Sequence, residues 1–157
     1  MRSADRGRAE VYAAEVAAFE GTELEAVVPF GVLVELAGRV VAQEWWPRGD
    51  VFVRRARSDA RDSTTRQASR VAIHLAAPQM TPATLIHELA HVLAGVESGH
   101  DELFRVAHVD LATSVLGADC AGWLTVAYRD AGLAVGVRQW PQPVLAVRSI
   151  AVGPAAE

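Results

Sequence analysis

The chain has 157 residues, 51% of them hydrophobic, and a formal net charge of -4 with a pI near 5.7. This size and apolar fraction predict one compact domain over residues 1–157 with an ample core. The acidic balance leaves no global basic footprint, so nucleic acid is not an expected partner.

The sequence also bears on the compartment of the protein. The N-terminus runs into charged residues, and no stretch approaches a transmembrane span free of charges, so neither export nor membrane insertion is expected. The single cysteine, Cys120, cannot form an intramolecular disulfide and excludes a four-cysteine zinc ribbon. We therefore expect a cytoplasmic protein in which Cys120 is a small core residue. The sequence leaves the oligomeric state open.

Two helices are predicted in the first third of the chain. Apolar residues recur among charges over residues 4–20, and Gly21 ends that pattern. A second helix is predicted over residues 30–44. The pair Trp45 and Trp46 is expected to end this helix by packing against the core or a cleft wall.

Two strands are predicted next, over residues 50–55 and 70–76, where β-branched residues are enriched. Residues 57–69 between them carry charges of both signs and a Ser/Thr cluster, which is typical of a solvated hairpin connection. His74 is expected to be an ordinary strand histidine, because its spacing does not connect it with a metal site.

The most informative motif is HExxH, formed by His87, Glu88 and His91. One helical turn separates the two histidines, so both imidazoles lie on one face and can bind a divalent metal such as Zn²⁺. Glu88 directly follows the first histidine, where it is placed to take a proton from a metal-bound water. The motif predicts a zinc hydrolase with Glu88 as general base.

Local signals place this motif in the middle of a buried helix. Thr81 is a good N-cap, Pro82 suits the first helical position, and Gly95 can close the helix in a left-handed conformation. Apolar residues surround the histidines, so the helix is expected to be buried on most sides. A core helix without metal is disfavoured, because it would leave many buried donors and acceptors to satisfy.

A catalytic zinc needs a third protein ligand, and the candidates follow the helix. His100 is favoured because zinc accepts imidazole readily, and because Gly95 and Gly99 bracket a tight connection before it. The alternatives that remain open are Glu97, Asp101, Glu102 and His108.

Two more helices are predicted downstream, over residues 101–116 and 121–132. His108 lies on the apolar stripe of the first, so a packing or supporting role suits it better than metal binding. Tyr128 and His108 are only loose candidates for the donor that stabilises a tetrahedral intermediate. Residues 144–152 are expected to form a late strand or an ordered arm.

The run HELAH, followed after a short turn by GHDELF, resembles the HExxH plus HGxxF arrangement of SprT-like zincin metalloproteases. The resemblance covers residues 81–104, and the chain is also similar in size to small actinobacterial HExxH metallohydrolases. It implies that His87, His91 and His100 bind zinc and that Glu88 is the general base, with Asp101 in place of the family's usual glycine.

The resemblance also implies a zincin-like α+β fold. In that fold a small antiparallel or mixed sheet packs against helices that include the HExxH helix. It further implies that the strand before this helix, residues 70–76, forms the sheet edge with which an extended peptide pairs.

Three functions are therefore compared. A zinc metallopeptidase acting on a peptide or protein substrate is favoured by the motif, the capped helix and the GHDELF element. A zinc hydrolase of a small non-peptide amide would share the same metal chemistry. A noncatalytic zincin-like binding module, in which metal only ties helices together or is absent, is the third hypothesis.

Overall fold

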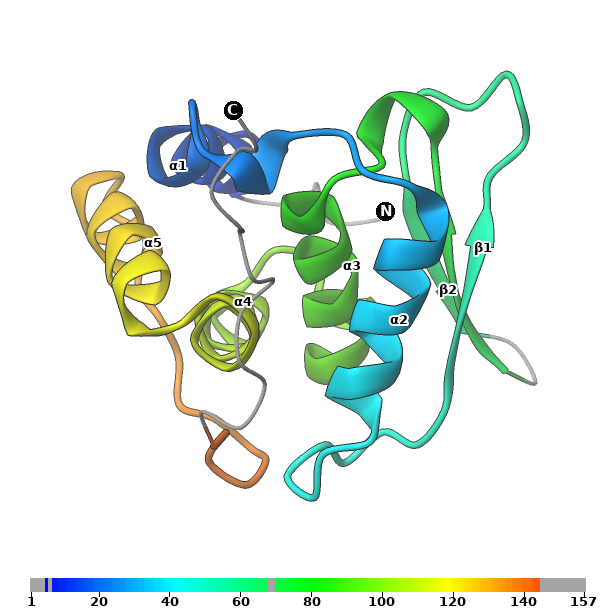
Figure 1. Cartoon of the computed structure of the whole chain (residues 1–157). Helices are drawn as coiled ribbons and strands as arrows, with labels where there is room; N and C mark the ends of the chain where they lie inside the picture. Colours follow the sequence, from blue (N-terminus) through cyan, green and yellow to red (C-terminus); the bar gives the residue numbers. More distant parts are fainter. Residues whose placement is uncertain (1–4, 6, 68–69, 145–157) are drawn as a thin grey trace, which may run out of the picture.

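The computed structural model describes residues 5, 7–67 and 70–144. Within these residues the fold is α+β, with five α-helices and a small three-stranded mixed sheet (Figure 1). The α-helices are α1 (Arg8–Phe19), α2 (Phe30–Val41), α3 (Pro82–Ala94), α4 (Glu102–Leu116) and α5 (Ala118–Asp130). The strands are β1 (Val51–Arg55), β2 (Thr64–Gln67) and β3 (Val71–Leu75). Short 3₁₀ helices are η1 (Glu23–Glu25), η2 (Ala77–Gln79) and η3 (Val96–Ser98).

The sheet has the order β1-β3-β2, with β1 parallel and β2 antiparallel to the central β3. The predicted hairpin connection over residues 57–69 is therefore wrong. A parallel pair cannot be joined by a tight hairpin, and part of that segment forms β2, in which Thr65 is opposite Ile73.

The prediction that residues 70–76 form the sheet edge is also wrong, because β3 has a neighbour on each side. Its apolar residues explain the central position, since Ile73 and Leu75 are fully buried. The polar strand β2, with the sequence TTRQ, is mostly exposed and lies at an edge. His74 is an ordinary strand residue, paired with Thr64 and Arg54.

Helix α3 runs through the middle of the fold, between the sheet and α4 (Figure 1). Thr81 caps it as predicted, because its side chain accepts a hydrogen bond from the backbone N–H of Thr84 at 3.1 Å. Gly95 ends it with φ 97° and ψ 133°, a positive φ that favours glycine but lies outside the left-handed helical region. Leu85, Ile86 and most other residues of α3 are buried, so it is covered on most sides.

The other helices follow the predicted ranges with shifted ends. Helix α2 stops at Val41, and Trp45 and Trp46 are buried beyond it in an edge-on contact at 5.9 Å between ring centroids. Gly117 turns the chain with φ 93°, so α5 begins at Ala118, before the predicted residue 121. Cys120 is only half-buried rather than a core residue. The strand or arm expected over residues 144–152 lies almost wholly outside the described residues.

No helix in the described part of the chain is long and apolar enough to cross a membrane.

A buried carboxylate on α4 fastens the segment after α5 to the core. Asp110 accepts two hydrogen bonds from the Arg138 guanidinium and one from the Trp140 indole, all at 2.8 Å. The Asp110 side chain is 5% exposed and the Arg138 side chain 38%. The buried charge is therefore neutralised by an arginine that reaches in from the surface.

We expect Arg138→Gln to lower the free energy of unfolding by about 1–3 kcal/mol, because Asp110 would stay buried without its cation. Chemical denaturation measures the change. Arg129→Gln is the control, since its pair with Asp130 is exposed and spans 3.8 Å, and it should shift stability by less than about 0.5 kcal/mol. Equal effects of both variants would contradict this account.

Candidate functional site

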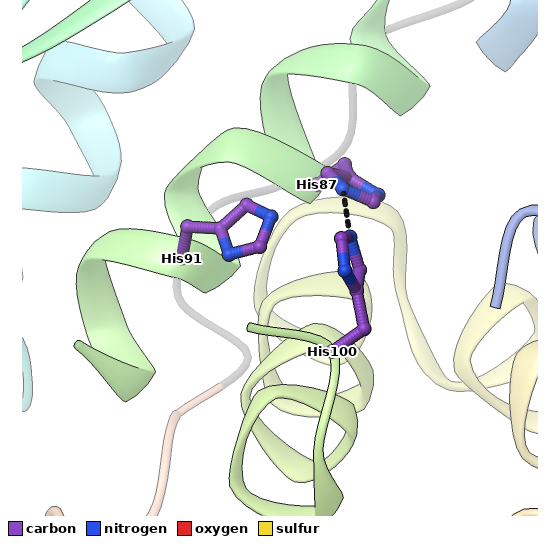
Figure 2. Close-up of side chains that lie close together, drawn as sticks. All are labelled: His87, His91 and His100. Carbon is purple, nitrogen blue, oxygen red and sulfur yellow. Dashed lines mark hydrogen bonds between the residues drawn. The ribbon is translucent and has the colours of Figure 1, made fainter. Parts of the chain in front are cut away.

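Three imidazoles converge between α3 and α4 (Figure 2). His87 and His91 project from one face of α3, one helical turn apart, and His100 comes from the turn before α4. One nitrogen from each ring lies within 4.8 Å of the others. His87 and His100 are buried and His91 is half-buried. The structure thus brings together the three histidines that the sequence singles out.

The other candidate ligands lie elsewhere. Among the described residues, no group of side chains that could share a metal includes Glu97, Asp101 or Glu102. Asp101 instead caps α4, since its carboxylate accepts hydrogen bonds from the backbone N–H groups of Leu103 and Phe104 at 3.0 and 3.1 Å. This capping role accounts for an aspartate directly after His100.

Two carboxylates orient two of the imidazoles. Glu15 Oε1 lies 2.8 Å from His87 Nδ1, and Asp5 Oδ2 lies 2.6 Å from His100 Nδ1. Asp5 also accepts a hydrogen bond from the His100 backbone N–H at 3.1 Å. Gly99 permits this approach, because a Cβ at that position would lie 2.9 Å from the Asp5 carboxylate. Sequence reasoning missed both carboxylates, since nothing local links them to the HExxH helix.

The Glu15 side chain is ionised at neutral pH. Burial alone would raise the pKa of this carboxyl group, but the charge of His87 and hydrogen bonds from His108 and His87 outweigh burial and lower it to about 2. Burial likewise opposes ionisation of Asp5, yet its contacts with His100 lower its pKa. Both groups are therefore carboxylates at neutral pH, and a carboxylate can only accept hydrogen bonds.

This chemistry fixes the tautomers of two imidazoles. Because each Nδ1 donates to a carboxylate, the Nε2 atoms of neutral His87 and His100 both present lone pairs, and they face one another at 3.1 Å. Two lone pairs at this distance repel unless a proton or a metal cation lies between them. Tetrahedral zinc, with nitrogen ligands at about 2.0–2.1 Å, would place two such atoms roughly 3.3 Å apart. The donor set fits Zn²⁺.

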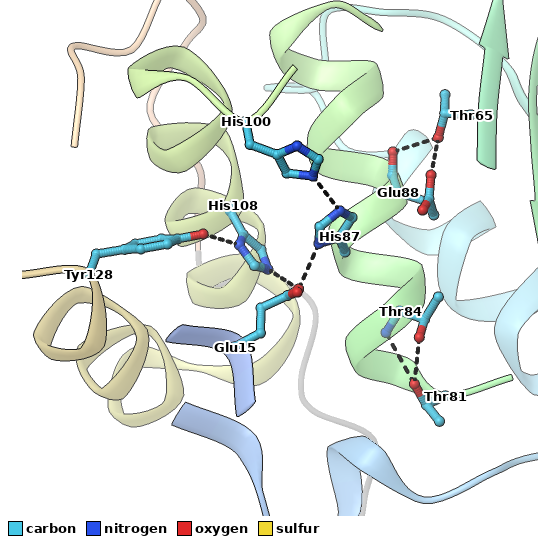
Figure 3. A network of polar contacts seen from close by, with 9 residues as sticks. All are labelled: Glu15, Thr65, Thr81, Thr84, His87, Glu88, His100, His108 and Tyr128. Carbon is cyan, nitrogen blue, oxygen red and sulfur yellow. Dashed lines mark hydrogen bonds and ion pairs between the residues drawn. The ribbon is translucent and has the colours of Figure 1, made fainter. Parts of the chain in front are cut away.

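Two buried side chains, His108 and Tyr128, form a polar network with Glu15 (Figure 3). His108 Nε2 lies 3.2 Å from Glu15 Oε1, and His108 Nδ1 lies 2.5 Å from the hydroxyl of Tyr128. Both His108 and Tyr128 are fully buried. They therefore cannot face a substrate as the loosely predicted donors, and instead hold Glu15 against His87. His108 could also share a metal with Glu15 and His87.

Phe104 closes the inner side of the three imidazoles. Its ring is fully buried, and its centroid lies 5.0, 4.5 and 4.8 Å from those of His87, His91 and His100. No polar atom can approach a metal from the volume that this ring occupies. An open coordination position would therefore face away from Phe104.

Glu88 points from α3 toward the edge strand of the sheet (Figure 3). The Thr65 hydroxyl of β2 lies 2.7 Å from Glu88 Oε2. Burial raises the pKa of Glu88, although His87 and the Thr65 hydrogen bond oppose the shift. A carboxylate with a raised pKa is a stronger base, which suits proton transfer near neutral pH.

A cleft opens beside His87 and Glu88. A hollow of about 180 Å³ is lined by both residues and by Tyr12, Asp62 and others from α1, η2 and α3. A shallower hollow of about 720 Å³ continues it and shares Tyr12, Asp62 and Gln79. His87 and Glu88 are therefore accessible from the surface along the side of α1.

Comparison with known proteins adds no relative: no protein-family model, curated protein or solved structure matches the chain.

Replacement of Glu15 by glutamine should weaken Zn²⁺ binding by roughly 10–100-fold, because the neutral amide holds His87 Nδ1–H less strongly. Competition with a chromophoric chelator measures the affinity. Glu20→Gln makes the same chemical change at an exposed residue just after α1 and should leave the affinity unchanged. Unaltered zinc affinity in Glu15→Gln would contradict the orienting role.

The metal-free protein should lose stability as pH falls from about 7 to about 5. Burial lowers the pKa values of His91, His100 and His108, with His91 at about 3, where the nearby charges of His87 and His100 add to the shift. These groups favour the folded state above their ordinary value of 6.5, and the unfolded chain binds more protons below it. His87 acts in the opposite direction, because Glu15 raises its pKa against the effect of burial.

Urea denaturation in the presence of a chelator, repeated across this pH range, tests the balance. The free energy of unfolding should decrease toward low pH, and His91→Gln should make its pH dependence shallower. A wild-type free energy that stays constant or rises toward pH 5 would show that the imidazoles are not neutral in the folded protein.

Proposed function

We propose that the chain is a zinc-dependent hydrolase with a zincin-like fold, and specifically a metallopeptidase that cleaves peptide or protein substrates. The observation that carries this proposal is the convergence of His87, His91 and His100, with 3.1 Å between the Nε2 atoms of His87 and His100, beside the buried carboxylate of Glu88. A site made only for packing would not need to bury two imidazoles and the Glu88 carboxylate beside a third imidazole.

His87, His91 and His100 would hold the metal through their ring nitrogens. When bound there, Zn²⁺ supplies a Lewis acid that acidifies water and polarises a carbonyl oxygen. Glu15 and Asp5 hold the rings of His87 and His100 in the tautomer that this binding needs. Phe104 keeps water away from the inner side of the three rings.

Glu88 is the proposed general base. Thr65 occupies Oε2, which leaves Oε1 to take the proton released as water attacks the substrate carbonyl carbon. The same oxygen then returns that proton to the amine nitrogen as the C–N bond breaks. The raised pKa of Glu88 supports both steps, because the group must hold a proton between them.

The position of β2 favours a peptide substrate. This edge strand carries Thr65, which contacts Glu88, so an extended chain that added to β2 would pass the general base. The edge lies at β2 rather than at β3, where the sequence placed it.

A zinc hydrolase of small amides is the second candidate. The hollow beside Glu88 measures about 180 Å³, which is smaller than the roughly 300–1,000 Å³ of most ligand pockets. A compact substrate would fill this hollow without using the strand edge. The two candidates share every residue role described above and differ only in what lies along β2.

Glu88→Gln should keep one zinc per chain and lower hydrolysis by roughly 10²–10⁴-fold, because the amide cannot accept the proton. Elemental analysis gives the zinc content, and mass spectrometry follows cleavage of a randomised peptide pool beside a panel of small amides. Glu44→Gln, at an exposed carboxylate, is the matched control.

Cleavage of peptides but not small amides by the wild type supports the metallopeptidase, and the reverse selects the second candidate. Full activity in zinc-loaded Glu88→Gln would contradict the proposed role of Glu88 as general base. A wild-type protein that binds no zinc even when zinc is added would overturn the hydrolase proposal as a whole.

A further inference from the structure

Hydrolysis of an amide needs a hydrogen-bond donor for the negative oxygen that forms on the carbonyl. His108 and Tyr128 cannot supply it, because they are fully buried behind Glu15. The donor must therefore belong to a residue that faces the cleft.

Tyr12 occupies that position. Its ring stacks on His87 with 5.2 Å between centroids and 12° between planes, and its centroid lies 5.6 Å from that of His100. Tyr12 is 40% exposed, whereas Phe104 on the inner side of the imidazoles is fully buried. Tyr12 therefore lies against His87 where the protein is open to solvent.

Helix geometry explains this placement. Tyr12 lies three residues before Glu15 on α1, so both side chains project from the same face of the helix. Because Glu15 is held against His87, the ring of Tyr12 is brought to the same imidazole. Tyr12 also lines both hollows of the cleft.

Other hydroxyl groups around the cleft make hydrogen bonds within the fold. The Thr81 side chain caps α3, and its hydroxyl lies 3.0 Å from the Thr84 hydroxyl. The Thr65 hydroxyl donates a hydrogen bond to the Glu88 carboxylate. Ser63 accepts a hydrogen bond from the backbone N–H of Ala76 at 3.0 Å. Among these groups, Tyr12 is the one whose ring also stacks on a candidate metal ligand, which places its phenol to meet a substrate oxygen.

The positively charged side chain of Arg8 lies near Tyr12. The guanidinium of Arg8, one turn earlier on α1, lies 5.7 Å from the centroid of the Tyr12 ring. Arg8 is exposed and lines the shallower hollow. Its charge favours a negative oxygen at this end of the cleft.

We propose that Tyr12 is a catalytic residue whose phenolic hydroxyl donates a hydrogen bond to the oxyanion formed on the substrate carbonyl. This inference rests on the proposed hydrolase function. As water adds to the carbonyl carbon, the carbonyl π electrons move to its oxygen and the water proton goes to Glu88. Tyr12 keeps its own proton throughout. When the C–N bond breaks, the electron pair returns to form the carbonyl and Glu88 protonates the amine.

Binding of two probes to the zinc-loaded full chain tests the role of Tyr12 without an activity assay. Methylphosphonate is tetrahedral and carries negative oxygens like the intermediate, whereas ethanethiol offers a single sulfur and no oxyanion. Isothermal titration calorimetry gives both affinities for the wild type and for Tyr12→Phe, which removes the hydroxyl but keeps the stacked ring. Zinc content and thermal stability are measured on the same samples.

The expected result is that Tyr12→Phe weakens methylphosphonate binding by roughly tenfold or more while ethanethiol and zinc binding stay unchanged. A further variant, Tyr12→Ala, should weaken methylphosphonate binding to at least the same extent. Equal methylphosphonate affinity in the wild type and Tyr12→Phe would overturn the role of Tyr12 and leave the hydrolase proposal standing. If neither probe binds the zinc-loaded wild type, the metal has no open coordination position, and both the role of Tyr12 and the hydrolase proposal are overturned.

Discussion

The hydrogen bond between Glu15 and His87 is the contact on which the candidate site depends. It joins α1 to the middle of α3, although α1 packs mainly on α5 and α3 lies between α4 and the sheet. A buried carboxylate is costly unless its charge is compensated, and here His87 and His108 both reach the same oxygen. The position of α1 and the tautomer of His87 are therefore linked.

Several features of the site follow from this link. The register of α1 brings Tyr12 over His87, since the two side chains of Tyr12 and Glu15 share one helix face. Asp5, which lies just before α1, orients His100 in the same way, because its carboxylate contacts the Nδ1 atom of His100. One short N-terminal segment thus orients two of the three imidazoles and forms a wall of the cleft.

The two sides of α3 carry different chemistry because helix geometry separates neighbouring residues. His87 faces Glu15 of α1, while Glu88 faces Thr65 on β2 (Figure 3). His91 lies beside Phe104 of α4. Phe104 fills the space among the imidazoles from the α4 side. The proposed base and two of the three proposed metal ligands are consequently held on one helix, close together but pointing to different neighbours.

Sequence patterns alone predict the features of this protein that depend on local geometry. The N-cap of α3, the shared face of His87 and His91, and most helices can be predicted because periodicity and capping act within a few residues. The parallel pairing of β1 with β3, the edge position of β2 and the burial of Tyr128 depend instead on tertiary packing. So do the contacts of Glu15 with His87, 72 residues away, and of Asp5 with His100, 95 residues away. Such contacts arise when distant elements pack around one core, and no spacing along the chain signals them in advance.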